Sequence, residues 1–244
     1  MRIFDLSSMN GYRIVEMIKT EERKRVYNDV SNAFAEADKN TKGPMNVILM
    51  INALQILDDH DPGLKGRGEI YVVSQVTTAA LDNNTNSYTT YTTQTFHGID
   101  NGDYLPFGQN GMVIWAGNVA GDAGKDPKEF IDFHIAIMES DKAQRDIAND
   151  LDGFKDKAKL DEIDKIIQGL APFDPTYLGK IFNLSKIAFD LLIFGLREDG
   201  DDFVGDFHDV LLRQQQYSPG RWPEDPKELY QAGDARLAYK VVVS

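Results

Sequence analysis

The residues best suited to chemistry lie in short acidic and amide-rich turns between residues 82 and 126. They are the run Asp82-Asn83-Asn84-Thr85-Asn86, a second turn at 100–103, and a third from Asp122 to Asp126. Carboxylate and amide oxygens are the ligands that Ca²⁺ prefers. If the segments between the turns are strands of a meander, the loops at 82–86 and 118–129 share one end of the sheet. The sequence therefore predicts a calcium site made of Asp82, Asn84, Asn86, Asp122 and Asp126.

The same residue types also have a purely conformational explanation, because Asp, Asn and Gly are ordinary turn residues. The D-x-N-x-N spacing at 82–86 matches the start of an EF-hand loop, but Ser87 stands where that loop needs glycine. Thr93 stands where it needs a bidentate glutamate. An EF-hand is therefore excluded. A second acidic group, made of Asp100, Asp103, Glu139 and Asp141, is expected at the opposite end of the sheet.

The four histidines, His60, His97, His134 and His208, are isolated in the sequence and form no H-E-x-x-H metal motif. His134 and Asp132 are two residues apart in an alternating segment, so they share one face of a predicted strand. With Ser140 they suggest a hydrolytic triad, although the chain has no G-x-S-x-G turn to present a nucleophile. The segment from Gly205 to Asp209 contains a second candidate, His208. The alternative is that these histidines are structural.

Composition excludes several classes of function. The absence of cysteine excludes disulfides, thiolate zinc sites and cysteine nucleophiles. The formal net charge of −13 argues against nucleic-acid binding and against electrostatic attachment to an anionic bilayer. The sequence also contains neither a P-loop nor a dinucleotide-binding glycine motif after a strand.

The N-terminal part of the chain is predicted to be helical. Residues 12–39 carry an intermittent apolar face, and Met45 to Leu57 is predicted as a second, apolar helix. The acidic, proline-containing stretch at 58–63 then marks a boundary. We therefore expect an N-terminal helical element at 1–63 and a second domain at 64–244.

The second domain has strand-like periodicity. Strands are predicted at 70–76, 87–96, 111–117, 130–138 and 236–243, and the segment 203–216 fits either a strand or a helix. In the fourth of these, Ile131, Phe133, Ile135 and Ile137 alternate with Asp132, His134 and Ala136. The C-terminal strand is expected to pair with a segment from the 70–138 meander.

A helical hairpin is predicted to interrupt this sheet at about 141–198. A charged helix at 142–171 is followed by an apolar helix from Tyr177 to Leu196, which we expect to be buried because it is apolar nearly all round. The alternative is a hairpin that inserts into membranes after refolding, as in pore-forming toxins. Lys180, Lys186 and Asp190 interrupt the apolar helix and make a simple membrane span costly.

The predicted fold class is α+β: an antiparallel β-sandwich with N-terminal helices and an inserted helical hairpin. It resembles C2-like sandwiches in architecture, but no motif assigns the chain to a family.

The first functional hypothesis is a non-enzymatic, calcium-dependent binding module that recognises a protein, glycan or membrane through its sandwich loops. The others are a membrane-active protein that uses the hairpin at 142–196 and a hydrolase centred on His134 or His208. We expect a cytoplasmic protein, or one exported without a cleaved signal peptide, because residues 1–11 have no apolar core of signal-peptide length. The sequence does not indicate an oligomeric state.

Overall fold

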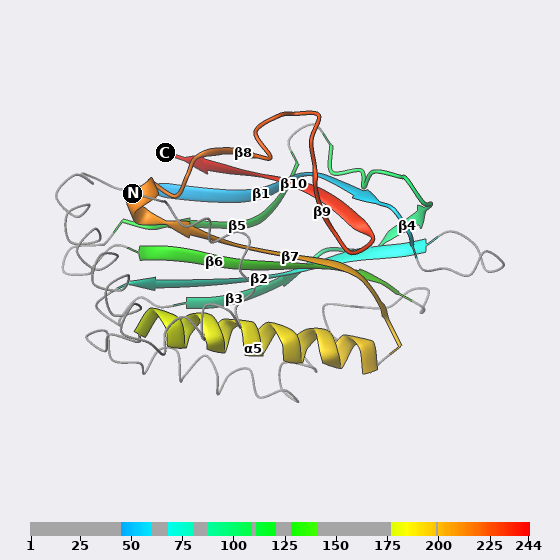
Figure 1. Cartoon of the computed structure of the whole chain (residues 1–244), viewed down its shortest axis with the longest axis horizontal. Helices are drawn as coiled ribbons and strands as arrows, with labels where there is room; N and C mark the ends of the chain where they lie inside the picture. The colour runs from blue at the N-terminus through cyan, green and yellow to red at the C-terminus, as the bar shows by residue number, and fades with distance from the viewer. Residues whose placement is uncertain are drawn as a thin grey trace, which may run out of the picture.

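In the described part of the chain, two antiparallel β-sheets and one α-helix form three successive layers (Figure 1). The computed structural model describes residues 45–59, 68–80, 87–108, 111–120, 128–140, 177–198 and 200–244. Within these ranges α5 (Tyr177–Glu198) is the single α-helix, and it lies along the outer face of one sheet. The helices predicted at 12–39 and 142–171 lie outside the described residues.

Within the described ranges each sheet has five strands. Sheet A follows the order β5-β1-β10-β8, with β9 also paired to β10; its strands are β1 (Asn46–Ile56), β5 (Met112–Asn118), β8 (Gly220–Trp222), β9 (Tyr230–Ala232) and β10 (Ala235–Val243). Sheet B follows the order β3-β2-β6-β7, with β4 also paired to β2; its strands are β2 (Gly68–Ala80), β3 (Ser87–Thr92), β4 (Phe96–Ile99), β6 (Lys128–Glu139) and β7 (Asp202–Leu212). A short 3₁₀ helix, η2 (Arg213–Gln215), follows β7.

The prediction of a helix at Met45–Leu57 is wrong, because these residues form β1. A register shift between Ile51 and Ala53 marks a β-bulge in the pairing of β1 with β10. The bulge changes the alternation from steps of two to a step of three, so Ile51 and Leu54 are both fully buried. Apolar residues three apart are also the signature of a helix, and this coincidence explains the error. β1 lies before the boundary expected at residue 63 and pairs with β5 and β10 after it.

The expected partner of the C-terminal strand is also wrong. β10 pairs with β1, β8 and β9 and with no strand from 70–138. Its neighbour on one side is β1, whose residues the sequence pattern predicts as a helix. The alternation within β10 is confirmed in part. Leu237, Tyr239 and Val241 are buried and Lys240 is exposed, but Ala238, which alternates with them, is also fully buried.

The two sheets pack face to face around the main core. This core takes Val47, Leu49 and Ile51 from sheet A together with Ile131, Phe133 and Ile135 from sheet B. The sheets also touch through the backbone, since Asp234 N donates to Val204 O at 2.8 Å. Gly205 fits this contact because a Cβ there would lie 2.3 Å from the carbonyl oxygen of Ala232.

The third layer forms where α5 packs on the other face of sheet B. Ala188, Leu192 and Leu196 contact this face and are fully buried. The opposite side of the helix is exposed: Ile187 is 49%, Leu191 40% and Phe194 62% accessible. We call these three residues the α5 ridge. The expectation that the helix is buried on all sides is therefore wrong for this face. Among the described residues, no helix has the length and apolar character needed to cross a membrane.

Candidate functional site

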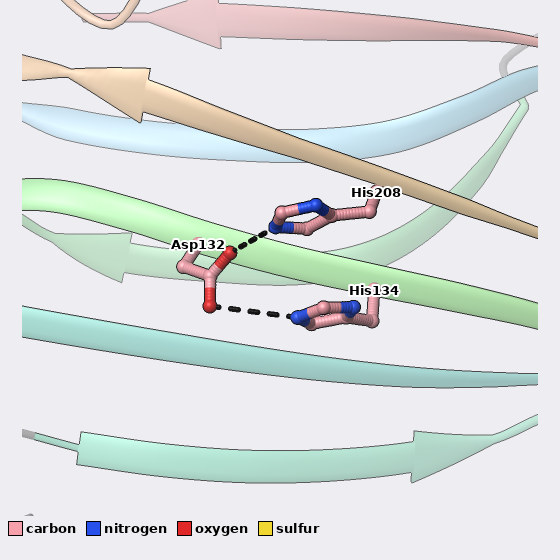
Figure 2. Close-up of side chains that lie close together, drawn as sticks. All are labelled: Asp132, His134 and His208. Carbon is pink, nitrogen blue, oxygen red and sulfur yellow. Dashed lines mark hydrogen bonds and ion pairs between the residues drawn. The ribbon is translucent and has the colours of Figure 1, made fainter. Parts of the chain in front are cut away.

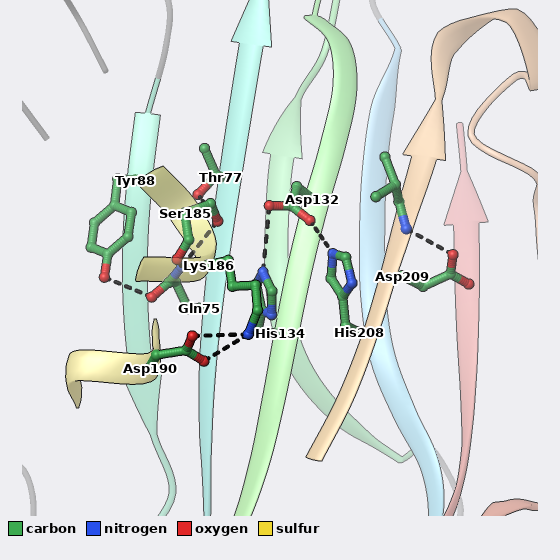
Figure 3. A network of polar contacts seen from close by, with 11 residues as sticks. Gln75, Thr77, Tyr88, Asp132, His134, Ser185, Lys186, Asp190, His208 and Asp209 are labelled. Atoms are coloured by element: carbon green, nitrogen blue, oxygen red, sulfur yellow. Dashed lines mark hydrogen bonds and ion pairs between the residues drawn. The ribbon is translucent and has the colours of Figure 1, made fainter. Parts of the chain in front are cut away.

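A band of polar side chains crosses the otherwise apolar interface between sheet B and α5 (Figure 3). We call it the polar belt. It consists of Gln75 and Thr77 on β2, Asp132 and His134 on β6, His208 on β7, and Ser185 on α5. Strand alternation puts it there, because positions 130, 132, 134, 136 and 138 of β6 share one face. The belt separates an apolar cluster around Ala136 and Met138 from a second around Phe130.

Asp132, His134 and His208 form the centre of the belt (Figure 2). His208 Nε2 lies 2.6 Å from Asp132 Oδ1, and His134 Nε2 lies 3.5 Å from Asp132 Oδ2. The side chain of Asp132 is fully buried and that of His134 is 6% exposed, whereas that of His208 is 28% exposed. One buried carboxylate is therefore approached by two imidazoles, and solvent reaches the group at His208.

Strand register brings the three residues together. His134 on β6 stands directly opposite His208 on β7, and Asp132 stands opposite Val210. The two imidazole rings stack with centroids 4.1 Å apart and planes 8° from parallel. Neither β7 nor this register could be read from the sequence, so His208 and the Asp132–His134 pair appear there as two unrelated candidates.

Hydrogen bonds fasten α5 to sheet B beside this centre. Gln75 Nε2 donates to the backbone oxygen of Ser185 at 2.7 Å and to its Oγ at 3.0 Å. The hydroxyls of Ser185 and Thr77 are 2.9 Å apart. Tyr88 OH donates to Gln75 Oε1 at 2.7 Å. Buried polar groups need such partners, and here they fix the position of the helix over the belt.

Three further side chains of α5 contribute to the surroundings of the centre. The ring of Phe189 stacks on His134 with a centroid distance of 4.9 Å. Lys186 Nζ lies 2.9 Å from both carboxylate oxygens of Asp190, and this pair is partly exposed. The helix thus places an apolar ring on one imidazole and a neutralised ion pair near the edge of the belt.

The electrostatics favour a charged Asp132–His208 pair. Burial alone would raise the pKa of Asp132, but the nearby imidazoles of His134 and His208 outweigh it and hold that pKa well below its usual range. Burial alone would lower the pKa of His208. The hydrogen bond and attraction of Asp132 outweigh it and raise that pKa. Asp209 adds to the rise, and Lys186 opposes it.

The same three residues have the composition of a metal site. Their ligand atoms all lie within 4.8 Å of one another. Among the described residues, this is the one group of three His, Asp or Glu side chains close enough to share a metal ion. Asp132 Oδ2 and His134 Nε2 are buried and make no hydrogen bond. Their separation of 3.5 Å is within ion-pair range but too long for a well-formed hydrogen bond. A bound cation would satisfy both atoms.

The predicted calcium ligands Asp82, Asn84, Asn86, Asp122 and Asp126 lie outside the described residues. The strand ends that flank them are described: Ala80 at the end of β2 pairs with Lys128 at the start of β6. These two ends therefore lie side by side, as the predicted calcium pole requires. At the other predicted pole, Asp103 accepts a hydrogen bond from the backbone of Asp100 across a turn.

His97 and Ser140 lie away from the centre formed by Asp132, His134 and His208. His97 is exposed and lies 3.0 Å from Glu69, away from the belt on β4, while His60 lies outside the described residues. Ser140 follows the end of β6, six residues from His134, which is about 20 Å along an extended strand. The suggested triad with Ser140 is therefore wrong.

Comparisons with protein-family models, curated proteins and solved structures give no match to this chain.

Proposed function

We propose that this protein is a non-enzymatic binding module that holds a divalent cation with Asp132, His134 and His208. One observation carries the proposal: two imidazole nitrogens point at the two oxygens of a single, fully buried carboxylate. Three ligands on one face of two adjacent strands can converge on one ion without any change in the backbone. This cation site is distinct from the calcium site predicted in the loops.

The cover over the centre supports binding rather than catalysis. Helix α5 is fastened to sheet B through Ser185, and Phe189 lies against His134. A substrate would therefore meet the edge of His208 and not the whole cluster. A small ion needs far less space than an organic substrate.

Thermal unfolding with and without divalent cations tests this function. A cation that binds the native state should stabilise it by about 2.7 kcal/mol at a hundredfold excess over the dissociation constant. Asp132→Asn should remove that shift, while Asp190→Asn, which changes an exposed carboxylate on α5, should retain it. An unfolding temperature that changes with no divalent cation and with no chelator would overturn the proposal.

The predicted calcium pole is a separate proposal with its own variant. Asp82→Ala should abolish a calcium-dependent rise in unfolding temperature if Asp82, Asn84, Asn86, Asp122 and Asp126 bind the ion. The rise should be insensitive to Asp132→Asn. The same measurement thus assigns any calcium effect either to the loops or to the belt. The C2-like architecture predicted from the sequence belongs with this proposal, since it would gather the loops at one end.

A hydrolase is the second candidate, favoured by the 2.6 Å contact between His208 and Asp132. An ionised carboxylate only accepts hydrogen bonds, so His208 Nε2 carries the proton toward it. In the neutral form of His208, Nδ1 of the partly exposed ring can accept a proton from water while the oxygen of that water adds to the carbonyl carbon of an ester. The adduct then breaks its bond to the alcohol oxygen, which leaves with the proton returned by Nδ1. Hydrolysis of p-nitrophenyl acetate that His208→Gln abolishes would support this function. If His208→Gln hydrolyses the ester at the same rate as the wild type and His97→Ala, a hydrolase centred on His208 is ruled out.

A partner surface is proposed on the α5 ridge. Ile187, Leu191 and Phe194 lie three and four residues apart, which is the spacing of a helix that binds in an apolar groove. A protein partner fits better than an anionic membrane because the chain carries a net charge of −13. Analytical ultracentrifugation of the wild type and Phe194→Asp shows whether the ridge binds a second copy of this chain. Vesicle flotation of the same two proteins shows whether it binds a membrane.

Two other outcomes point to the remaining alternatives. Acid-triggered leakage of vesicles would support the membrane-active alternative. Glycan binding that Phe194→Asp retains would place the binding surface on the loops.

A further inference from the structure

We infer that the cation of the Asp132–His134–His208 centre is a divalent transition-metal ion of the zinc type, bound by Nε2 of both histidines and a carboxylate oxygen of Asp132. The inference rests on the proposed function and specifies its ligand. Three independent features carry it: the donor atoms, the placement of the three residues on the sheet, and two buried polar atoms that make no hydrogen bond.

The donor atoms select the class of ion. Two of the three are imidazole nitrogens, which suit Zn²⁺, Cu²⁺, Ni²⁺ and Fe²⁺. Ca²⁺ requires six to eight oxygen ligands, and Mg²⁺ also takes oxygen and retains several waters. The belt supplies the carboxylate of Asp132, while the nearby carboxylate of Asp190 is held by Lys186. This donor set is poor for calcium and suited to zinc.

The placement on the sheet allows a compact site. Asp132 and His134 are two residues apart on β6, and His208 stands opposite His134 on β7, so all three project from one face. Zinc bonds of about 2.0–2.2 Å in a tetrahedron put ligand atoms about 3.3 Å apart. Here the ligand atoms lie within 4.8 Å of one another. Side-chain rotations that move the ligand atoms by about 1–2 Å would therefore bring all three within bonding distance of one zinc ion.

The stacked imidazoles show which movement binding requires. Their planes are 8° from parallel, so the two Nε2 atoms lie side by side and do not point at one shared position. A bound ion must turn the rings out of the stack. Phe189 lies on His134 on the helix side, so the turn should also change the contact between α5 and the sheet.

Asp132 Oδ2 and His134 Nε2 provide the evidence that is independent of donor type. Both are buried without a hydrogen bond, and the 3.5 Å contact between them replaces only part of the hydration that each loses on burial. A metal ion between them would compensate both. Three protein ligands leave a fourth tetrahedral position, which water can reach beside the partly exposed His208.

Isothermal titration of the full-length chain with ZnCl₂, CoCl₂, CaCl₂ and MgCl₂ tests the inference. We expect Zn²⁺ and Co²⁺ to bind one per chain at this centre, and Co²⁺ to give the visible absorption of a low-coordinate nitrogen and oxygen site. Loss of one metal ligand should weaken binding more than about 100-fold, since even outer partners of a metal site contribute 10- to 100-fold. His208→Gln and Asp132→Asn should both show this loss, whereas the matched control His97→Ala should bind as the wild type does.

Nuclear magnetic resonance of the histidine rings gives a readout that needs no variant. The chain has four histidines, and Zn²⁺ should shift the Nε2 signals of His134 and His208 while leaving that of His97 in place. This result keeps the test decisive if Asp132→Asn does not fold.

The alternative outcomes separate the inference from the proposed function. Binding of Ca²⁺ or Mg²⁺ but not Zn²⁺, lost in Asp132→Asn, would overturn the ion class and leave the cation-binding function intact. Zinc binding that His208→Gln and Asp132→Asn both retain would overturn the site. Absence of any divalent-cation binding would overturn both.

Discussion

His134 and His208 stand opposite each other on β6 and β7, and their parallel imidazole rings lie 4.1 Å apart, measured between centroids. This cross-strand pair directs both Nε2 atoms to the carboxylate of Asp132. The cluster lies inside the interface between sheet B and α5, where Phe189 of the helix stacks on His134.

Asp132→Asn should destabilise the metal-free protein by about 1–3 kcal/mol, because it removes the buried negative charge between the two imidazoles and leaves one oxygen acceptor where the carboxylate has two. Urea unfolding at pH 6 would measure this difference. The control is Asp190→Asn, which removes an exposed carboxylate whose ion pair with Lys186 contributes less than about 1 kcal/mol. Equal effects of the two substitutions would contradict a structural role for the cluster.

The Asp132–His208 pair should stabilise the metal-free protein most between the ordinary pKa values of the two groups, 3.8 and 6.5. A carboxyl whose pKa is lowered by folding stabilises above its ordinary pKa, and that stability is lost as the pH falls through the folded value. An imidazole whose pKa is raised stabilises below its ordinary pKa, and that stability is lost as the pH rises through the folded value. The free-energy difference between wild type and His208→Gln, measured by urea unfolding from pH 3 to 9, should therefore peak near pH 5. A difference that stays constant over this range would contradict the assigned pair.

In sheet B, β2, β3 and β6 were predictable because their periodicity is local, whereas β4 was not predicted as a separate strand and the segment of β7 also fitted a helix. The alternation of Ile131, Phe133 and Ile135 with Asp132 and His134 correctly predicted β6 and the residues that share each face. That periodicity could not show that the polar face is covered. Both faces of β6 are buried because α5, distant in sequence, packs over Asp132 and His134.

The candidate site was only half visible in the sequence because strand pairing is not encoded locally. The two-residue spacing of Asp132 and His134 is readable, whereas the register that puts His208 opposite His134 depends on tertiary packing. β1 shows the other limit of periodicity. Its bulge between Ile51 and Ala53 produces a helix-like spacing within a strand.

Leu191→Ala and Leu192→Ala form a matched pair that tests the orientation of α5. Leu192 is fully buried against sheet B, so its truncation should cost about 2–5 kcal/mol. Leu191 is 40% exposed, so the same change should cost less than about 1 kcal/mol, well below what a buried position would predict. Urea unfolding of both variants would measure the difference. Similar large losses for the two leucines would show that the α5 ridge is covered in solution.

Removal of β10 should prevent cooperative folding, because this strand lies between β1 on one side and β8 and β9 on the other. A chain ending at Asp234 would expose the edge of β1 and lose the buried row of Leu237, Tyr239 and Val241, so it should aggregate. Point variants make the test quantitative. Leu237→Ala should cost about 2–5 kcal/mol, whereas Arg236→Ala at the adjacent exposed position should cost less than about 1 kcal/mol. Calorimetry and size-exclusion chromatography would follow all three chains. A truncated chain that stays monomeric and melts as the full-length protein does would show that sheet A does not depend on its C-terminal strand.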